Sequence, residues 1–185
     1  MKILMPLTDG FEEIEAITVI DILRRAEIEV SVAGLKEGLM EGSHKVKVLP
    51  DTSLDKIDPK DFDGIVLPGG YPGYVNLGKD ERVLNIVKEM DRAGKYVTAI
   101  CCAPYTLIKA GVLQGRKATV SPSGKKEVSA AAQYCEERVV VDRNLITSQS
   151  PGTAMEFALK LVEILTGEDA MKKVKAQTLA ICKGD

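Results

Sequence analysis

Two adjacent cysteines, Cys101 and Cys102, are the residues with the clearest chemical potential in the chain. The apolar run Tyr96–Ile100, which is typical of a buried strand, ends directly before them, and Pro104 suits the first turn of a helix. A tight strand-to-helix turn lifts a side chain out of the sheet edge, and a helix N-terminus favours the reactive thiolate. The pattern indicates Cys101 as a nucleophile and Cys102 as an inert neighbour that supplies a backbone N–H. The alternative is that Cys101 is a small core residue ending a strand, as free cysteines often are.

A glycine pair and an acid could complete such a site. Gly69–Gly70 follows another apolar run, and the N–H groups of Gly70 and Cys102 together could stabilise an oxyanion. Glu15 is one of three acids in a single helical turn, and its position allows it to point inward. A buried carboxyl beside a thiolate would have a raised pKa and could both donate and accept a proton. Taken singly, the glycines also fit an ordinary turn and Glu15 fits a solvated helix surface.

The chain contains only one histidine, His44, so a cysteine–histidine mechanism must use it or be absent. The four cysteines include an adjacent pair and lack the Cys-x-x-Cys spacing of structural zinc sites. They also do not resemble a disulfide framework, since nothing marks the chain for secretion. We therefore expect reduced thiols, no metal and no other cofactor.

The overall composition excludes several classes of partner. The 185 residues carry a formal net charge of -2, and Lys and Arg are scattered, so we expect neither nucleic acid nor an anionic membrane as partner. No apolar stretch has the length of a signal peptide or a transmembrane helix. We expect a cytoplasmic protein that folds as a single domain over residues 1–185.

Short apolar segments alternate with amphipathic ones along nearly the whole chain. In the first amphipathic segment, Ile14, Ile17, Ile20 and Leu23 share one apolar face. The patterns predict strands at 2–7, 29–33, 46–49, 64–67, 96–100, 117–120, 139–141 and 145–147, and helices at 12–25, 81–93, 104–110, 153–165 and 168–175. This alternation predicts an α/β fold, a doubly wound and mostly parallel sheet with helices on both faces. In such sheets ligands bind beyond the carboxyl ends of the strands, where Cys101 and Gly70 are expected.

Four motifs, in order, resemble the ThiJ/PfpI superfamily over nearly the whole chain. They are Gly10–Glu15, Val66–Gly70, Ala99–Pro104 and Ser150–Thr153. The sequence is most similar to the branch that contains the Parkinsonism-associated protein deglycase. The resemblance implies a flavodoxin-like fold, shared with class I glutamine amidotransferases.

The resemblance also implies roles for individual residues. Cys101 matches the family nucleophile, and Glu15 matches the acid that hydrogen-bonds it. Gly70 and Cys102 match the positions whose N–H groups form the oxyanion or sulfinate pocket. Family members are usually homodimers with the site near the subunit interface.

Two further positions bear on that interface. Arg25 and His44 match positions that are often arginines lining it, and His44 departs from arginine. We therefore expect both residues at the interface, with a role in the site as the alternative.

One departure from the family concerns the histidine that often follows the nucleophile. Ser121 stands at that position, and a serine hydroxyl orients a group or holds water but does not act as a base at neutral pH. A cysteine protease of this fold has histidine where Cys102 stands, and a glutamine amidotransferase needs one late in the chain. Both classes are therefore disfavoured.

The resemblance implies two functions. The first is glutathione-independent conversion of 2-oxoaldehydes, such as methylglyoxal to lactate, or deglycation, with the Cys101 thiolate as nucleophile and Glu15 as acid and base. The second is a non-enzymatic redox sensor in which Cys101 oxidises to a sulfinate. A third possibility is that the fold is retained and the chemistry is largely lost.

Overall fold

The computed structural model describes residues 1–181, and Cys182 lies outside the described part. Its strands are β1 (Lys2–Leu7), β2 (Glu29–Gly34), β3 (Met40–Glu41), β4 (Lys47–Val48), β5 (Thr52–Ser53), β6 (Gly64–Leu67), β7 (Tyr96–Ile100), β8 (Lys117–Ala118), β9 (Gln133–Tyr134), β10 (Val139–Asp142) and β11 (Leu145–Ser148). Its α-helices are α1 (Glu13–Arg25), α2 (Gly73–Leu77), α3 (Glu81–Arg92), α4 (Pro104–Ala110), α5 (Lys125–Ala131), α6 (Ala154–Thr166) and α7 (Glu168–Thr178).

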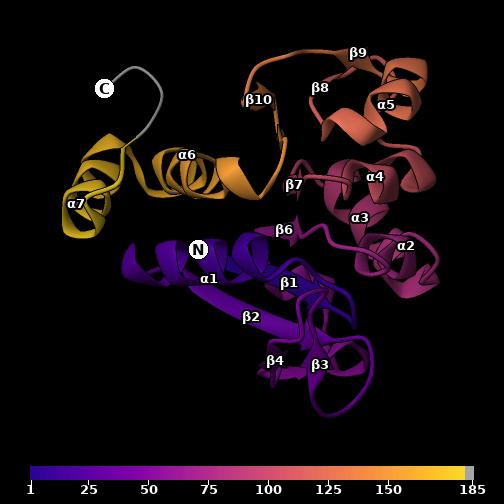
Figure 1. The fold of residues 1–185 in the computed structure, drawn as a ribbon, viewed down its shortest axis with the longest axis horizontal. Helices are drawn as coiled ribbons and strands as arrows, with labels where there is room; N and C mark the ends of the chain where they lie inside the picture. The colour runs from indigo at the N-terminus through magenta and orange to yellow at the C-terminus, as the bar shows by residue number, and fades with distance from the viewer. Residues whose placement is uncertain (182–185) are drawn as a thin grey trace.

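Within the described residues, a seven-stranded sheet forms the centre of the molecule, in the order β10-β11-β7-β6-β1-β2-β5. Every neighbouring pair in it is parallel except the β10–β11 hairpin. Helices α1, α6 and α7 lie on one side of the sheet and α2 to α5 on the other (Figure 1). The predicted doubly wound fold is confirmed.

Two apolar cores, one on each face, hold these layers together. One contains Phe11 and Phe157 with the buried sides of α1 and α6. The other joins the buried sides of α3 and α4 to residues such as Ile65 and Val97. Strands β6 and β7 contribute to both cores, which explains why their sequences are apolar without alternation. Among the described helices, none is long and apolar enough to cross a membrane.

The apolar face predicted for α1 is wrong in its first turns. Ile14 is 55% exposed and Ile17 41% exposed, whereas Ala16 and Val19 are fully buried. The core-facing stripe is therefore rotated toward Ala16, Val19, Ile20 and Leu23. The rotation also buries Glu15, on the edge of this stripe.

Two short predicted strands lie outside the main sheet. Strand β4 pairs with β3 as an antiparallel hairpin, and β8 pairs with β9 in a separate two-stranded sheet. The edge strand β5, the hairpin strand β3 and helices α2 and α5 were not predicted. The helices predicted at 104–110 and 168–175 form as α4 and the longer α7.

Candidate active site

Cys101 forms a sharp turn at the carboxyl end of β7. Its φ of 62° lies in the left-handed region, which is strained for a residue with a side chain. Two hydrogen bonds hold this conformation. The Cys101 N–H donates to the Ser148 carbonyl at 3.0 Å, and the Cys101 carbonyl accepts from the Ser121 N–H at 3.0 Å. The backbone therefore has the conformation expected of a nucleophile elbow, and the side chain remains partly exposed.

Glu15 reaches the same place from the first turn of α1. It has no exposed surface, and its Oε2 accepts a 2.8 Å hydrogen bond from the N–H of Gly69. The N–H of Glu12 donates in return to the Gly69 carbonyl at 2.9 Å. These two bonds fasten the start of α1 to the turn that follows β6.

Gly69 lies between Glu15 and Cys101, in a space that only a residue without a side chain fits. A Cβ atom at this position would lie 2.7 Å from Glu15 Oε2, 2.8 Å from Cys101 Cβ and 3.3 Å from Cys101 Sγ. Any side chain would therefore displace both residues. The glycine allows the carboxyl and the thiol to meet over its Cα.

Burial raises the pKa of Glu15 to about 7, although the hydrogen bonds from Gly69 and Cys101 favour the carboxylate. The other carboxyl oxygen, Oε1, is buried and makes no hydrogen bond of regular geometry within the described residues. A buried oxygen without a partner is costly when charged, which favours the protonated acid. Glu15 is thus poised to exchange a proton near neutral pH.

Two backbone N–H groups remain available beside the sulfur. The N–H groups of Gly70 and Cys102 donate to no other group in the described part of the chain. Gly70 takes a φ of 92°, which turns the backbone after β6 away from the strand path. Unpaired N–H groups in the two segments that meet at Cys101 are suited to bind an anionic oxygen.

The two thiols titrate as partners. The hydrogen bond between their side chains, together with burial and the nearby Glu15, raises the pKa of Cys101. The same bond lowers the pKa of Cys102 to about 5, and hydrogen bonds from Ser121 and Ser123 act in the same direction. The hydrogen bonds around the pair therefore favour the thiolate at Cys102 and the thiol at Cys101. Transfer of one proton along the shared bond moves the negative charge to Cys101.

The Ser121 side chain bonds to Cys102, whereas its main chain bonds to Cys101. Its Oγ lies 3.1 Å from Cys102 Sγ and 2.8 Å from Ser123 Oγ, and Ser123 Oγ lies 3.5 Å from the same sulfur. Sequence reasoning missed Ser123. The spacing Ser121-x-Ser123 was a possible signal, but it has meaning only once the segment is placed beside Cys102.

Arg25 lies away from these groups. It is in the last turn of α1, and Glu15 is in the first, so about 15 Å of helix separates them. Its Nε donates to Asp21 at 2.8 Å, and the side chain is exposed. The structure therefore does not bring Arg25 into the Cys101 site.

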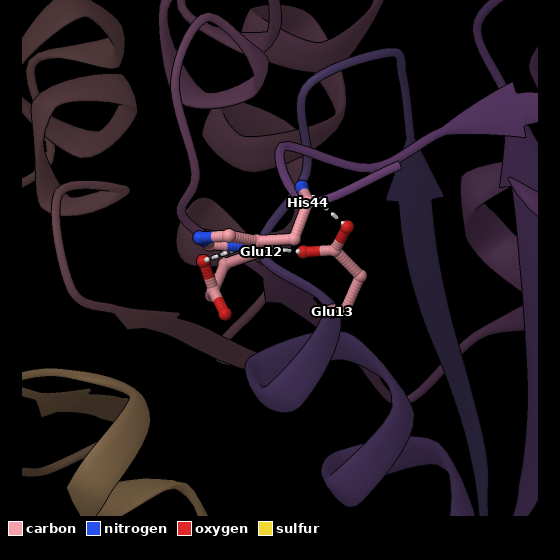
Figure 2. Close-up of side chains that lie close together, drawn as sticks. All are labelled: Glu12, Glu13 and His44. Atoms are coloured by element: carbon pink, nitrogen blue, oxygen red, sulfur yellow. Dashed lines mark hydrogen bonds and ion pairs between the residues drawn. The ribbon is translucent and has the colours of Figure 1, made fainter. Parts of the chain in front are cut away.

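His44 also makes its contacts elsewhere, on the loop between β3 and β4. Its Nδ1 lies 3.0 Å from Glu13 and 3.4 Å from Glu12, as Figure 2 shows. The hydrogen bond to Glu13 raises the pKa of His44. Burial opposes ionisation of Glu13, but hydrogen bonds, that from the His44 side chain first, outweigh it and lower the pKa. Among the described residues there is no hydrogen bond between His44 and Cys101.

These three side chains are also the nearest approach to a metal site. One ligand atom from each of Glu12, Glu13 and His44 lies within 4.8 Å of the others, the one such group among the described residues. The Ser43 hydroxyl lies within hydrogen-bond distance of all three. The cluster joins the loop between β3 and β4 to the start of α1 through hydrogen bonds.

Comparisons with known proteins show the family of this chain. The DJ-1/PfpI family model matches residues 1–164. The chain belongs to the DJ-1/PfpI family. It is 43% identical to Protein dj-1beta of Drosophila melanogaster over 92% of each chain. The crystal structure of Drosophila melanogaster DJ-1beta superposes with a TM-score of 0.94 over 98% of each chain, at 41% identity.

Other DJ-1/PfpI relatives carry more specific names. Deglycase TK1284 of Thermococcus kodakarensis is 38% identical over 89% of this chain and 99% of its own length. A structure of Toxoplasma gondii DJ-1, described as oxidized, gives a TM-score of 0.93 at 35% identity, covering 98% of this chain and 99% of the other. The family therefore includes proteins named for an enzymatic activity and one named for its oxidation state.

We expect the Glu15→Gln substitution to stabilise the protein increasingly as pH rises. Glu15 holds its proton more tightly folded than unfolded, where a glutamate has a pKa of about 4.3, so the wild type loses stability between pH ~4 and 7. Glutamine does not titrate, so the variant gains about 3 kcal/mol relative to wild type above pH 7 and little below pH 4. Urea unfolding of both proteins from pH 4 to 8 measures the difference. A difference that stays constant with pH would contradict the raised pKa.

We expect Gly70→Ala to destabilise the fold by about 2–4 kcal/mol. A Cβ there would lie 2.2 Å from the Glu12 nitrogen and 2.4 Å from the Gly10 carbonyl oxygen, and the φ of +92° adds strain. Gly152→Ala is the matched control, because a Cβ at Gly152 has nothing within 4 Å, and it should stay within about 0.5 kcal/mol. Thermal and urea unfolding compare the two. Equal stabilities would show that the turn after β6 can shift freely.

Proposed function

We propose that this DJ-1/PfpI protein converts 2-oxoaldehydes to 2-hydroxy acids without glutathione, with Cys101 as nucleophile and Glu15 as acid and base. The observation that supports it most is the buried Glu15 carboxyl, which meets Cys101 over Gly69 and has a pKa of about 7. A carboxyl that changes protonation near neutral pH is suited to move a proton in both directions. Methylglyoxal, with lactate as product, is the simplest substrate.

The first step is addition of sulfur to the aldehyde. The Cys101 thiolate attacks the aldehyde carbon, forming a carbon–sulfur bond while the carbonyl π electrons move to oxygen. The N–H groups of Gly70 and Cys102, which have no other acceptor among the described residues, would stabilise that oxygen. The product is a hemithioacetal.

The second step moves a proton between the two carbons. The Glu15 carboxylate removes the proton from the former aldehyde carbon and returns one to the adjacent carbonyl carbon, which leaves a thioester of a 2-hydroxy acid. Water then attacks the thioester carbonyl and releases the acid and the Cys101 thiol. The net change adds one water to the 2-oxoaldehyde, and no oxidant or cofactor is consumed.

This route does not require the histidine that Ser121 replaces. The Ser121 hydroxyl is engaged with Cys102 at 3.1 Å, where it favours a thiolate in the cysteine pair. Glu15 lies close enough to Cys101 for the two side chains to affect each other's pKa. Proton transfer is therefore assigned to the carboxyl alone.

Deglycation fits the same site. A thiol or amine that has added to a 2-oxoaldehyde presents the same carbon to Cys101. The bond from this carbon to the original nitrogen or sulfur breaks, the amine or thiol leaves with a proton, and the bond to the Cys101 sulfur that replaces it gives the same hemithioacetal. The archaeal relatives named Deglycase TK1284 and Deglycase PH1704 favour this extension. Both reactions share every residue assigned here.

Redox sensing is the second candidate. Cys101 is partly exposed beside a carboxyl that is protonated in part near neutral pH, and a protonated carboxyl can donate to a sulfinate oxygen. The Toxoplasma gondii relative described as oxidized supports this candidate. A peroxide would be the oxidant.

We also propose that the protein is a homodimer through a hydrophobic patch formed by Ile14, Ile17 and Val46. Their side chains are 55%, 41% and 50% exposed, although each is apolar. The Val46 N–H donates to Glu13 at 3.4 Å, so the hairpin and the start of α1 form one surface. Arg25 and His44, predicted at the interface, lie on the same two elements and are exposed. A second copy would cover the patch beside the site.

We expect lactate production from methylglyoxal without glutathione. Cys101→Ser and Glu15→Gln should each lower kcat/KM by at least about 100-fold, and Cys135→Ser should leave it unchanged. The wild-type rate should rise with pH through about 7, as Glu15 becomes a carboxylate. Chiral analysis of the lactate identifies the product, and single-turnover kinetics give the rates of the wild type and the variants at each pH. If the wild type shows no turnover while peroxide still converts Cys101 to the sulfinate, the redox-sensor proposal replaces the enzyme proposal.

We expect Ile17→Arg to separate the dimer. Sedimentation equilibrium should give twice the 20.0 kDa chain mass for wild type and the single mass for the variant, because a buried charge opposes association. Val141→Arg is the control, since Val141 is also 45% exposed but lies on the edge strand β10. A wild-type protein that sediments as a monomer would sink the dimer proposal.

A further inference from the structure

In the proposed reaction the Cys102 thiol shares a hydrogen bond with Cys101 but forms no bond to the substrate, so its own reactivity is left unused. Two hydroxyls lie within hydrogen-bond distance of its sulfur, Ser121 Oγ at 3.1 Å and Ser123 Oγ at 3.5 Å. The two hydroxyls are 2.8 Å apart. Hydroxyl groups that converge on a sulfur stabilise it as a thiolate.

A cavity of about 200 Å³ opens beside this sulfur. Neither Cys101 nor Glu15 lines it, so it is separate from the site described above. Its volume lies below the roughly 300–1,000 Å³ of pockets for drug-sized ligands, which restricts it to small molecules. Its wall is mostly apolar and aromatic, formed by Tyr74, Tyr105, Ile108, Val120 and Val128.

We infer that Cys102 is a second nucleophile, and that this cavity seats short, neutral, apolar α,β-unsaturated carbonyl compounds for addition to its sulfur. The inference combines a thiol held by two hydroxyls with an apolar cavity that has this thiol in its wall. Hydrogen bonds from Cys101, Ser121 and Ser123 lower the pKa of Cys102, which favours the reactive thiolate.

The addition is balanced without a further reactant. The Cys102 thiolate forms a carbon–sulfur bond at the β-carbon, and the π electrons of the C=C bond move to give an enolate. The enolate takes one proton from water, which completes a neutral thioether adduct. The carbonyl group is retained, so no redox change occurs.

Glu127 determines which electrophiles enter. It lies on the cavity wall, and its negative charge opposes ionisation of Cys102. The same charge repels an anionic electrophile while leaving a neutral one unaffected. The cavity therefore discriminates by charge as well as by size and polarity.

The test uses the full chain with Cys101→Ser, which removes the nucleophile of the proposed reaction and keeps a hydroxyl donor next to Cys102. In this variant the reactivity of Cys102 is measured without the proposed Cys101 reaction, so the failure of one proposal can be told from the failure of the other. The probes are N-ethylmaleimide, which is neutral, and 3-maleimidopropionate, its anionic counterpart. Peptide mass mapping at pH 6 follows adduct formation at Cys102 and at the internal comparison, Cys135, which is also partly exposed.

We expect N-ethylmaleimide to modify Cys102 at least about tenfold faster than Cys135, since ordinary thiols are largely protonated at pH 6. The anionic probe should be slowed at least about fivefold more at Cys102 than at Cys135, and Glu127→Gln should remove that difference. Ile108→Trp, at the half-buried edge of the cavity, and the pair Ser121→Ala with Ser123→Ala should each slow Cys102 severalfold.

Two results would overturn the inference. One is a Cys102 rate equal to that of Cys135 with the neutral probe. The other is a Cys102 rate that neither Ile108→Trp nor the serine substitutions change. The reactivity would then follow from the solvent exposure of the sulfur alone. The serine substitutions remove only hydroxyls, so they keep the test decisive if the larger tryptophan unfolds the protein.

Discussion

The burial of the Glu15 carboxyl is the constraint on which the arrangement of the site depends. An ionisable group without exposed surface is stable only where the protein supplies partners, and here the principal partner is the Gly69 N–H. The bond from the Glu12 N–H back to the Gly69 carbonyl makes the connection reciprocal. The start of α1 is thereby fixed to the end of β6, and Gly69 must lack a side chain for Cys101 to approach. One buried acid thus determines the position of three chain segments.

The same burial gives the site its chemical character. A carboxyl with a pKa of about 7 lies beside two thiols that share a hydrogen bond, which raises the pKa of Cys101 and lowers that of Cys102. The strained turn at Cys101 presents the sulfur, and the unpaired N–H groups beside it suit an anionic oxygen. The residues proposed as acid–base group, nucleophile and anion donors lie in α1 and directly after β6 and β7. These segments are far apart in sequence, but β6 and β7 are neighbours in the sheet, and Glu15 ties α1 to the turn after β6.

Much of this could be predicted from the sequence because it depends on local signals. Apolar runs ended by Gly69 or Cys101 define buried parallel strands, and Pro104 marks the helix that follows. The errors arose where local pattern does not determine the partner. Ile14 and Ile17 have the periodicity of a core face, and apolarity alone does not distinguish a core from an exposed patch. A short run such as 46–49 does not show whether it joins the main sheet or a hairpin. The contact between Ser121 and Cys102 spans 19 residues, and no spacing rule predicts it.

Position 102, directly after the turn at Cys101, has one role for its main chain and another for its side chain. In the proposed reaction, position 102 contributes a main-chain N–H, which every amino acid except proline possesses. Its side chain points to a different cavity, with its own hydroxyls and its own apolar wall. A substitution at position 102 therefore leaves the main-chain donor in place, but it changes the wall of the cavity and removes the thiol that shares a hydrogen bond with Cys101. One side chain thus couples the proposed nucleophile to the neighbouring cavity, so a molecule bound to the Cys102 sulfur would also alter the pKa of Cys101.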